Sequence, residues 1–170
     1  MNPKISDWNG KRVWLVGASS GIGAAVAREL AGRGAKLALT ARSADKLLAL
    51  SIPDAFLLPC DATDVASLSD ARQSILETFG GIDLVVYLAG DYVPMRAEDF
   101  DLAIAEKVVT VNFNAAMRLA ATVLGDLQPG GGIAFAGLLW FGLGLLVGPP
   151  ELRALAGSAG TWMAFALAAT

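Results

Sequence analysis

A seven-residue turn from Gly17 to Gly23 carries the residues with the clearest capacity for chemistry. It follows a short apolar run and precedes apolar residues at helical spacing, so the segment predicts a strand, a glycine turn and a helix. Gly17 is expected to make a tight turn, Gly21 to let backbone approach a bound group, and Gly23 to bring helix and strand close together. Unpaired N–H groups and the positive end of the helix dipole at this place suit a diphosphate.

A second candidate lies about twenty residues further on, where dinucleotide folds contact the adenosine ribose. An acid there would accept hydrogen bonds from a free 2′-hydroxyl and repel a 2′-phosphate. This chain instead has Ala41 followed by Arg42. A guanidinium can hold a phosphate through two hydrogen bonds, so the charge favours NADP over NAD as cofactor. The alternative is that Arg42 is a solvated loop charge.

The spacing G-x-x-x-G-x-G resembles the TGxxxGIG turn of the short-chain dehydrogenase/reductase family, with Val16 where that family usually has threonine. The resemblance covers residues 11 to about 136. It implies an NAD(P)-dependent oxidoreductase that interconverts a carbonyl and a hydroxyl on a small-molecule substrate. The residues expected at the phosphates are Gly17, Ser19, Ser20, Gly21, Ile22 and Gly23.

The resemblance also implies roles for residues that follow later strands. Asp61 stands where the family contacts the adenine amine, although an aspartate here could equally cap the following turn. Ala89 and Gly90 match the small pair that lets the inner ribose approach, in a segment reading Tyr-Leu-Ala-Gly where the family has NNAG. Asn112 matches the catalytic asparagine that helps to hold a proton-relay water, and Asn114 is expected to be an ordinary surface residue.

The proton-handling groups of the family are missing. A serine is expected at the end of the fifth strand, but Gly137 and Leu138 occupy that region. The chemistry also needs a tyrosine whose pKa is lowered by a nearby lysine, in the pattern Tyr-x-x-x-Lys. The only tyrosines are Tyr87 and Tyr92, and no lysine follows Lys107. We therefore expect impaired catalysis, with a non-catalytic NADP-binding or interaction module as the alternative.

Composition sets further bounds. The 170 residues suit one domain, and the net charge of −3 without a basic cluster gives no indication of a nucleic-acid partner. The single cysteine, Cys60, excludes an internal disulfide, and the absence of histidine excludes histidine bases and histidine metal ligands. No metal site is expected. The first twelve residues lack an apolar stretch of signal-peptide length, which predicts a cytoplasmic protein.

Charge is distributed unevenly along the chain. After residue 131 the only charged residues are Glu151 and Arg153. Three accounts of this apolar tail remain open: a shifted or cut reading frame, a real variant that completes the core without catalytic residues, and a membrane-tethering segment. Loss of the family's later helices and strands would uncover apolar surface, so a homo-oligomer or marginal stability is expected unless the tail replaces them.

The elements that must position these residues alternate regularly. Apolar strands are expected at 13–16, 36–40, 55–58, 82–88 and 133–136, and helices at 22–30, 44–50, 65–79 and 100–127. This alternation predicts an α/β fold of parallel βαβ units. The resemblance implies a doubly wound, Rossmann-like sheet in the order 3-2-1-4-5, with residues 1–136 as the dinucleotide-binding domain and 137–170 as an atypical tail.

Overall fold

The computed structural model describes residues 5–136. The predicted tail at 137–170, its three alternative accounts and the region expected to hold the family serine lie outside the described residues.

Five parallel strands form one sheet in the order β3-β2-β1-β4-β5, as the resemblance implied. The strands are β1 (Arg12–Val16), β2 (Lys36–Ala41), β3 (Phe56–Pro59), β4 (Ile82–Tyr87) and β5 (Leu127–Phe135). The α-helices are α1 (Gly21–Gly32), α2 (Ala44–Leu48), α3 (Val65–Phe79), α4 (Leu102–Val109) and α5 (Ala115–Val123). A 3-10 turn, η1 (Ala97–Asp99), precedes α4, and a π-helical turn, η2 (Thr110–Asn114), joins α4 to α5.

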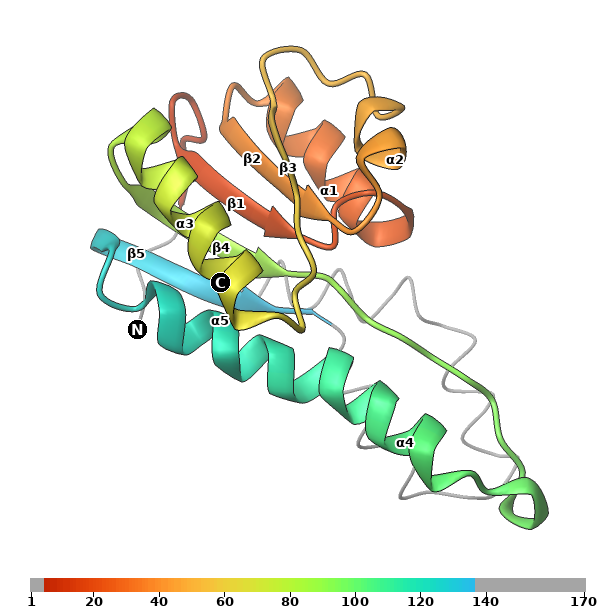
Figure 1. Ribbon diagram of the computed structural model, residues 1–170. Helices are drawn as coiled ribbons and strands as arrows, with labels where there is room; N and C mark the ends of the chain where they lie inside the picture. Colours follow the sequence, from red (N-terminus) through yellow and green to blue (C-terminus); the bar gives the residue numbers. More distant parts are fainter. Residues whose placement is uncertain (1–4, 137–170) are drawn as a thin grey trace.

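The central strand β1 divides its side chains between two cores, one on each face of the sheet. Val13 and Leu15 belong to the core that includes α1 and α2, whereas Trp14 and Val16 belong to the core that includes α3 and α5. Figure 1 shows the same two layers of helices around the sheet. A strand covered on both faces is apolar at successive positions, which explains the unbroken run at 13–16.

Local signals determine where the third helix begins and ends. The Asp64 carboxylate caps α3 by accepting a hydrogen bond of 3.0 Å from the Ala66 N–H. Gly80 ends the helix in the left-handed conformation, at φ 73°. Asp64 is therefore the N-cap residue of the helix predicted at 65–79.

Ion pairs connect elements that are distant in sequence. The Arg12 guanidinium donates to the Asp83 carboxylate with Nε–Oδ2 and Nη2–Oδ1 distances of 2.8 and 2.9 Å, which joins the beginnings of β1 and β4. Arg72 on α3 likewise pairs with Asp126, just before β5. Both pairs fix the amino-terminal side of the sheet, opposite the edge where the glycine turn lies.

Two sequence predictions were wrong in their boundaries. The helix expected at 100–127 is α4, η2 and α5, which together run from 102 to 123. The strand expected at 133–136 begins at Leu127, so Pro129 and the following glycines lie within β5. Leu127 pairs with Ile82 and Gly132 with Leu84, which marks an irregularity at an edge strand. Proline and glycine are tolerated at such a place because the hydrogen-bonding ladder is already interrupted.

The buried face of α1 follows the apolar spacing of the sequence only in part. Of the four apolar residues at helical spacing, Leu30 is buried and Val26 is half-buried, whereas Ile22 is 48% exposed and Ala25 is exposed too. The other buried residues of the helix are Gly23, Ala24 and Ala27. Small residues form this face because the helix approaches the sheet closely.

None of the helices in the described range has the length and apolar character needed to cross a membrane.

Candidate nucleotide-binding site

The predicted site residues gather along one edge of the sheet, where the strands end. The glycine turn follows β1, Arg42 follows β2, Asp61 follows β3, and Ala89 and Gly90 follow β4. In open parallel sheets, ligands bind at this carboxyl edge, at the point where the strand order reverses. In this sheet that point lies between β1 and β4. The topology therefore brings together residues that are separated by more than seventy positions in sequence.

Gly17 allows two strand ends to meet. Its φ is +90°, and a Cβ placed on it would lie 2.4 Å from the backbone nitrogen of Ala89. The N–H groups of Gly17 and Ala18 donate to the Thr40 carbonyl at 2.8 and 3.1 Å, which ties the turn to β2. The predicted tight turn at Gly17 is confirmed.

Gly21 and Gly23 differ in what surrounds them. A Cβ on Gly23 would lie 2.1 Å from the Gly17 carbonyl oxygen, so this position requires glycine for close packing of helix and strand, as predicted. Gly21 has φ +52° and nothing within 4 Å of the place of a Cβ. The turn is therefore open at Gly21, and backbone there is accessible to a ligand.

The first turn of α1 offers unpaired donors. The first intrahelical bond runs from the Ala24 N–H to the Ser20 carbonyl, so the N–H groups of the preceding helical residues lack helical acceptors. Ser20 is the N-cap residue, but its side chain makes no capping hydrogen bond, and no acid lies in the first turn. The hydroxyl and the amides form a site suited to an anion.

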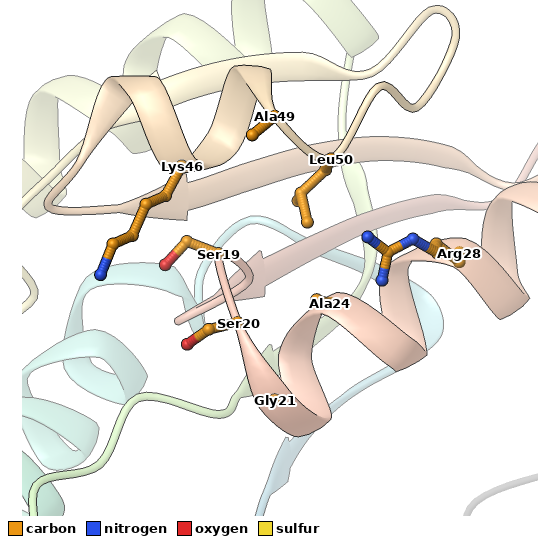
Figure 2. Close-up of a pocket in the computed structure, with 8 residues that line it drawn as sticks. All are labelled: Ser19, Ser20, Gly21, Ala24, Arg28, Lys46, Ala49 and Leu50. Atoms are coloured by element: carbon orange, nitrogen blue, oxygen red, sulfur yellow. The ribbon is translucent and has the colours of Figure 1, made fainter.

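A pocket of about 340 Å³ opens beside this turn, between α1 and α2. Ser19, Ser20 and Gly21 line one part of it, and Lys46 from α2 and Arg28 from α1 line the rest with three apolar residues. Figure 2 shows the Lys46 side chain extending toward the turn and the Arg28 guanidinium on the other side. Neither cation is among the site residues predicted from the sequence, although their positions in the first helix and four residues after Arg42 could have indicated them.

Arg42 and Asp61 are exposed neighbours at the ends of β2 and β3. The Asp61 carboxylate accepts hydrogen bonds from the N–H and hydroxyl of Thr63 at 2.9 and 2.8 Å. These bonds, with a smaller contribution from the Arg42 charge, lower the pKa of Asp61. Asp61 thus caps the turn, as one of the two alternatives proposed, and the adenine contact stays a prediction.

Asn112 lies in η2 and contacts the loop that follows β4. Its Oδ1 accepts a hydrogen bond of 2.7 Å from the Asp91 N–H, and its Nδ2 donates to the Asp91 carbonyl at 2.9 Å. A Cβ on Gly90 would lie 3.6 Å from Asn112 Oδ1. The structure therefore brings Asn112 next to Gly90, and Gly17 next to Ala89.

Tyr87 connects the same two regions from within the core. Its hydroxyl donates to the carbonyl of Val111 in η2, and its side chain is 1% exposed. Burial raises the pKa of Tyr87 to about 12. The family asparagine is absent here, and Tyr87 provides a different connection between β4 and the π-helical turn.

Other reactive groups in the described part of the chain give no second site. Residues 5–136 contain no cluster of acidic or cysteine side chains that would hold a metal ion. Cys60 is a buried free thiol, and burial raises its pKa.

A parallel sheet in the order 3-2-1-4-5 with a glycine turn after its first strand defines a Rossmann-like domain. Residues 11–136 match the family described as short chain dehydrogenase. The chain belongs to the short-chain dehydrogenase/reductase family.

Relatives of known sequence support this assignment. The chain is 30% identical over 138 residues to a mouse protein named "Dehydrogenase/reductase SDR family member 7", covering 70% of this chain and 41% of the relative. It is 36% identical over 115 residues to a glucose 1-dehydrogenase of Gluconobacter oxydans, covering 64% of this chain and 43% of that one.

Solved structures give the same result. A short-chain dehydrogenase from Burkholderia cenocepacia in complex with NADP superposes with a TM-score of 0.70 at 30% identity, covering 76% of this chain and 56% of that one. A short-chain dehydrogenase/reductase from Serratia marcescens gives 0.70 at 28% identity, covering 75% and 55%. The chain thus spans about half the length of the relatives that it matches.

Proposed function

We propose that the chain binds NADP at the carboxyl edge of the sheet, with its diphosphate on the glycine turn. The observation that carries this proposal is the open turn at Gly21, followed by a helix whose first N–H groups have no helical acceptors. Ser19, Ser20, Ile22 and the three glycines would hold the diphosphate, and Ala89 and Gly90 would lie against the inner ribose. Arg42 at the end of β2 favours NADP over NAD, and a similar solved structure contains NADP.

The reduced cofactor supplies a hydride for reduction of a carbonyl when it is bound. The residues of this chain would contribute binding and orientation, with Asn112 beside the inner ribose region. The parent activity proposed is carbonyl and hydroxyl interconversion on a small molecule, because the chain belongs to this oxidoreductase family.

We further propose that the 170-residue chain turns over poorly. Tyr87 is buried and donates its hydroxyl to Val111, so it does not replace a catalytic tyrosine that must reach a substrate oxygen. Tyr92 is exposed, but no lysine lies four residues after it. With no Tyr-x-x-x-Lys pair in the sequence, these 170 residues lack the family's proton donor, which favours the alternative of a non-catalytic NADP-binding module.

Titration with NADPH tests the binding, with nicotinamide fluorescence as the readout. A saturable change supports the proposal, and no change with a folded sample refutes it. Adding carbonyl substrates and following the oxidation of NADPH tests the impairment. Turnover at rates typical of enzymes, on the order of 1 per second or more, would refute the impairment but leave the binding site intact.

Two substitutions at Ile22 test whether NADPH binds at the glycine turn. It is exposed in the first turn of α1, so Ile22→Asp places a carboxylate beside the amides proposed for the diphosphate. An acid at a helix N-terminus stabilises the helix, so the affinity for NADPH should fall without loss of folding. Asparagine has nearly the size of aspartate but no charge, so Ile22→Asn should retain more of the affinity for NADPH.

We also expect the chain to self-associate or to be marginally stable, unless the tail at 137–170 covers its apolar surface. The helices α4 and α5 extend along one side of the molecule (Figure 1). The exposed large apolar side chains along α4, the turn η2 and α5 are Leu102, Val109, Phe113 and Met117. An apolar stripe of this kind favours association of copies, which light scattering over a range of protein concentrations would detect. A cytoplasmic location stays a prediction, which cell fractionation would test.

A further inference from the structure

Tyr87 stands at a place in the sheet where the backbone is held from both sides. It is the last residue of β4 and pairs with Val16 on β1 and with Phe135 on β5. Its carbonyl accepts a hydrogen bond of 2.9 Å from the Ala136 N–H, and the Leu88 N–H donates to the Val16 carbonyl at 2.7 Å. Neighbouring strands therefore fix the backbone that carries the Tyr87 side chain.

The Tyr87 ring lies in the core that includes α3 and α5. It is 1% exposed and belongs to the same core as Ala115 and Ala116, which follow η2 directly and are fully buried. From this core the Tyr87 hydroxyl donates to the Val111 carbonyl. The family motif NNAG has an asparagine at this position, and its shorter side chain would not extend as far as a tyrosine hydroxyl.

The turn η2 is held at two consecutive residues. Val111 receives the Tyr87 hydroxyl, whereas the Asn112 side chain bonds to both backbone groups of Asp91, at 2.7 and 2.9 Å. The first contact connects the turn to the end of β4, and the second connects it to the loop that follows β4. The Tyr87 hydroxyl therefore influences where the Asn112 side chain meets this loop.

The loop after β4 has few other attachments. Figure 1 shows an extended chain between β4 and η1. In the described part of the chain, the hydrogen bonds to residues 90–95 are the two between Asn112 and Asp91. The Asp91 carboxylate also lies 3.9 Å from Lys107 Nζ, but the Lys107 side chain is 66% exposed, and surface pairs of this kind contribute little. The position of Gly90, next to Asp91, therefore follows that of η2.

We propose that Tyr87 is a positioning residue for the half of NADP that carries the nicotinamide. This inference rests on the proposed function, in which Ala89 and Gly90 lie against the inner ribose. Through Val111 and Asn112, the Tyr87 hydroxyl holds this wall in place. The adenosine would bind at the ends of β2 and β3, on the other side of β1 in the sheet. Removal of the hydroxyl should therefore affect the two halves of the cofactor unequally.

The test compares NADPH with 2′,5′-ADP, which contains the adenosine with its 2′- and 5′-phosphates but no nicotinamide. Calorimetric titrations of the full 170-residue chain would use Tyr87→Phe, Asn112→Ala and the double variant. Tyr92→Phe is the matched control, because it removes a hydroxyl from a side chain that is 78% exposed. Asp126→Asn controls for lost stability, because it weakens the pair with Arg72 at the amino-terminal side of the sheet. Urea denaturation would establish that each variant is folded, with sucrose added to a marginally stable one.

Tyr87→Phe should weaken the binding of NADPH about fivefold, as for the loss of one hydrogen bond, and leave the affinity for 2′,5′-ADP unchanged. Asn112→Ala should also weaken only NADPH. Without the Asn112 side chain, the Tyr87 hydroxyl no longer acts on the loop, so the double variant should bind NADPH as well as Asn112→Ala does. Tyr92→Phe and Asp126→Asn should change the affinity for neither ligand.

Three results would overturn the inference while NADPH binding by the unmodified chain stands. The first is an unchanged affinity of Tyr87→Phe for NADPH, and the second is an equal loss for NADPH and 2′,5′-ADP. The third is a double variant in which the two losses of NADPH affinity add fully, because the residues would then act independently. If the unmodified chain does not bind NADPH, the proposed function is overturned together with the inference.

Discussion

The side chain of Asn112 forms two hydrogen bonds with the backbone of Asp91, accepting from its N–H at 2.7 Å and donating to its carbonyl at 2.9 Å. This pair connects the π-helical turn η2 to the loop after β4, beside Gly90. π-Helical turns inside α-helices are frequent at functional sites, and here the turn presents the asparagine to the loop. Asn112 thus acts as a positioning residue in this structure, and its role in proton relay stays a prediction.

Replacing Asn112 with alanine should therefore destabilise the protein. Asn112→Ala removes both bonds to Asp91 and should lower the free energy of unfolding by about 1 to 2 kcal/mol. Urea denaturation measures the change. Asn114→Ala is the control in the same turn, since Asn114 makes no side-chain hydrogen bond within residues 5–136, and it should cost less than about 0.5 kcal/mol. Equal effects of the two changes would contradict the role given to Asn112.

Gly23 should tolerate no side chain. A Cβ there would lie 2.1 Å from the Gly17 carbonyl oxygen, so Gly23→Ala must displace α1 from the turn. We expect a loss of stability of about 1 to 3 kcal/mol, as for overpacked sites, together with weaker NADPH binding. Thermal unfolding and fluorescence titration measure the two effects.

Gly32 provides the control in the same helix. A Cβ at Gly32 meets nothing within 4 Å, and the residue is the last of α1. Gly32→Ala should leave stability unchanged or raise it by up to about 1 kcal/mol, because alanine lowers the entropy of the unfolded chain. A large loss in Gly32→Ala would mean that α1 is sensitive to any substitution rather than to close packing at Gly23.

The sequence was sufficient to predict the strand order and the place of the glycine turn. Both depend on local patterns, apolar runs for buried strands and glycine spacing for the turn, that are readable without knowing what packs against them. The roles of Gly17 and Gly23 were predicted for the same reason, since the turn geometry itself requires glycine.

The sequence could not predict features that depend on contacts between distant elements. The pairing of Leu127 with Ile82 draws Pro129 and its glycines into β5, although these residues are typical of turns. Ile22 is exposed because close approach of α1 selects small residues for its buried face. Lys46 and Arg28 line one pocket, from its two ends, only because α1 and α2 pack on the same face of the sheet.

The Arg12–Asp83 pair should make stability depend on pH in the acid range. The hydrogen bond from Arg12 is the main cause that lowers the pKa of Asp83. In the unfolded chain the pKa of an aspartate is about 3.9. Between the lowered pKa of folded Asp83 and this value, the unfolded chain binds more protons than the folded chain, so stability rises with pH. The contribution of Asp83 is fully present above the unfolded value and is lost as pH falls through the folded pKa.

The variant Asp83→Asn tests this dependence. At pH 7 it should be less stable than the unmodified chain, by on the order of 1 kcal/mol, and the gap should narrow as the pH is lowered toward 3. Asp70→Asn removes the same charge from an exposed position on α3, outside the described ion pairs, and should change stability little at either pH. Urea titrations at several pH values measure the difference, and a gap that widens at low pH would show the sign to be wrong.

Tyr87 should affect stability through its hydroxyl and at alkaline pH. Tyr87→Phe removes the bond to the Val111 carbonyl and should cost about 1 kcal/mol at pH 7, whereas Tyr92→Phe, at a side chain that is 78% exposed, should have no effect. Because burial raises the pKa of Tyr87 to about 12, the unfolded chain releases this proton near pH 10 while the folded chain retains it, so stability falls as pH rises from 10 to 12. Tyr87→Phe should reduce this alkaline loss, which unfolding measured between pH 8 and 11 would detect. An alkaline loss of the same size in both proteins would assign it to other groups.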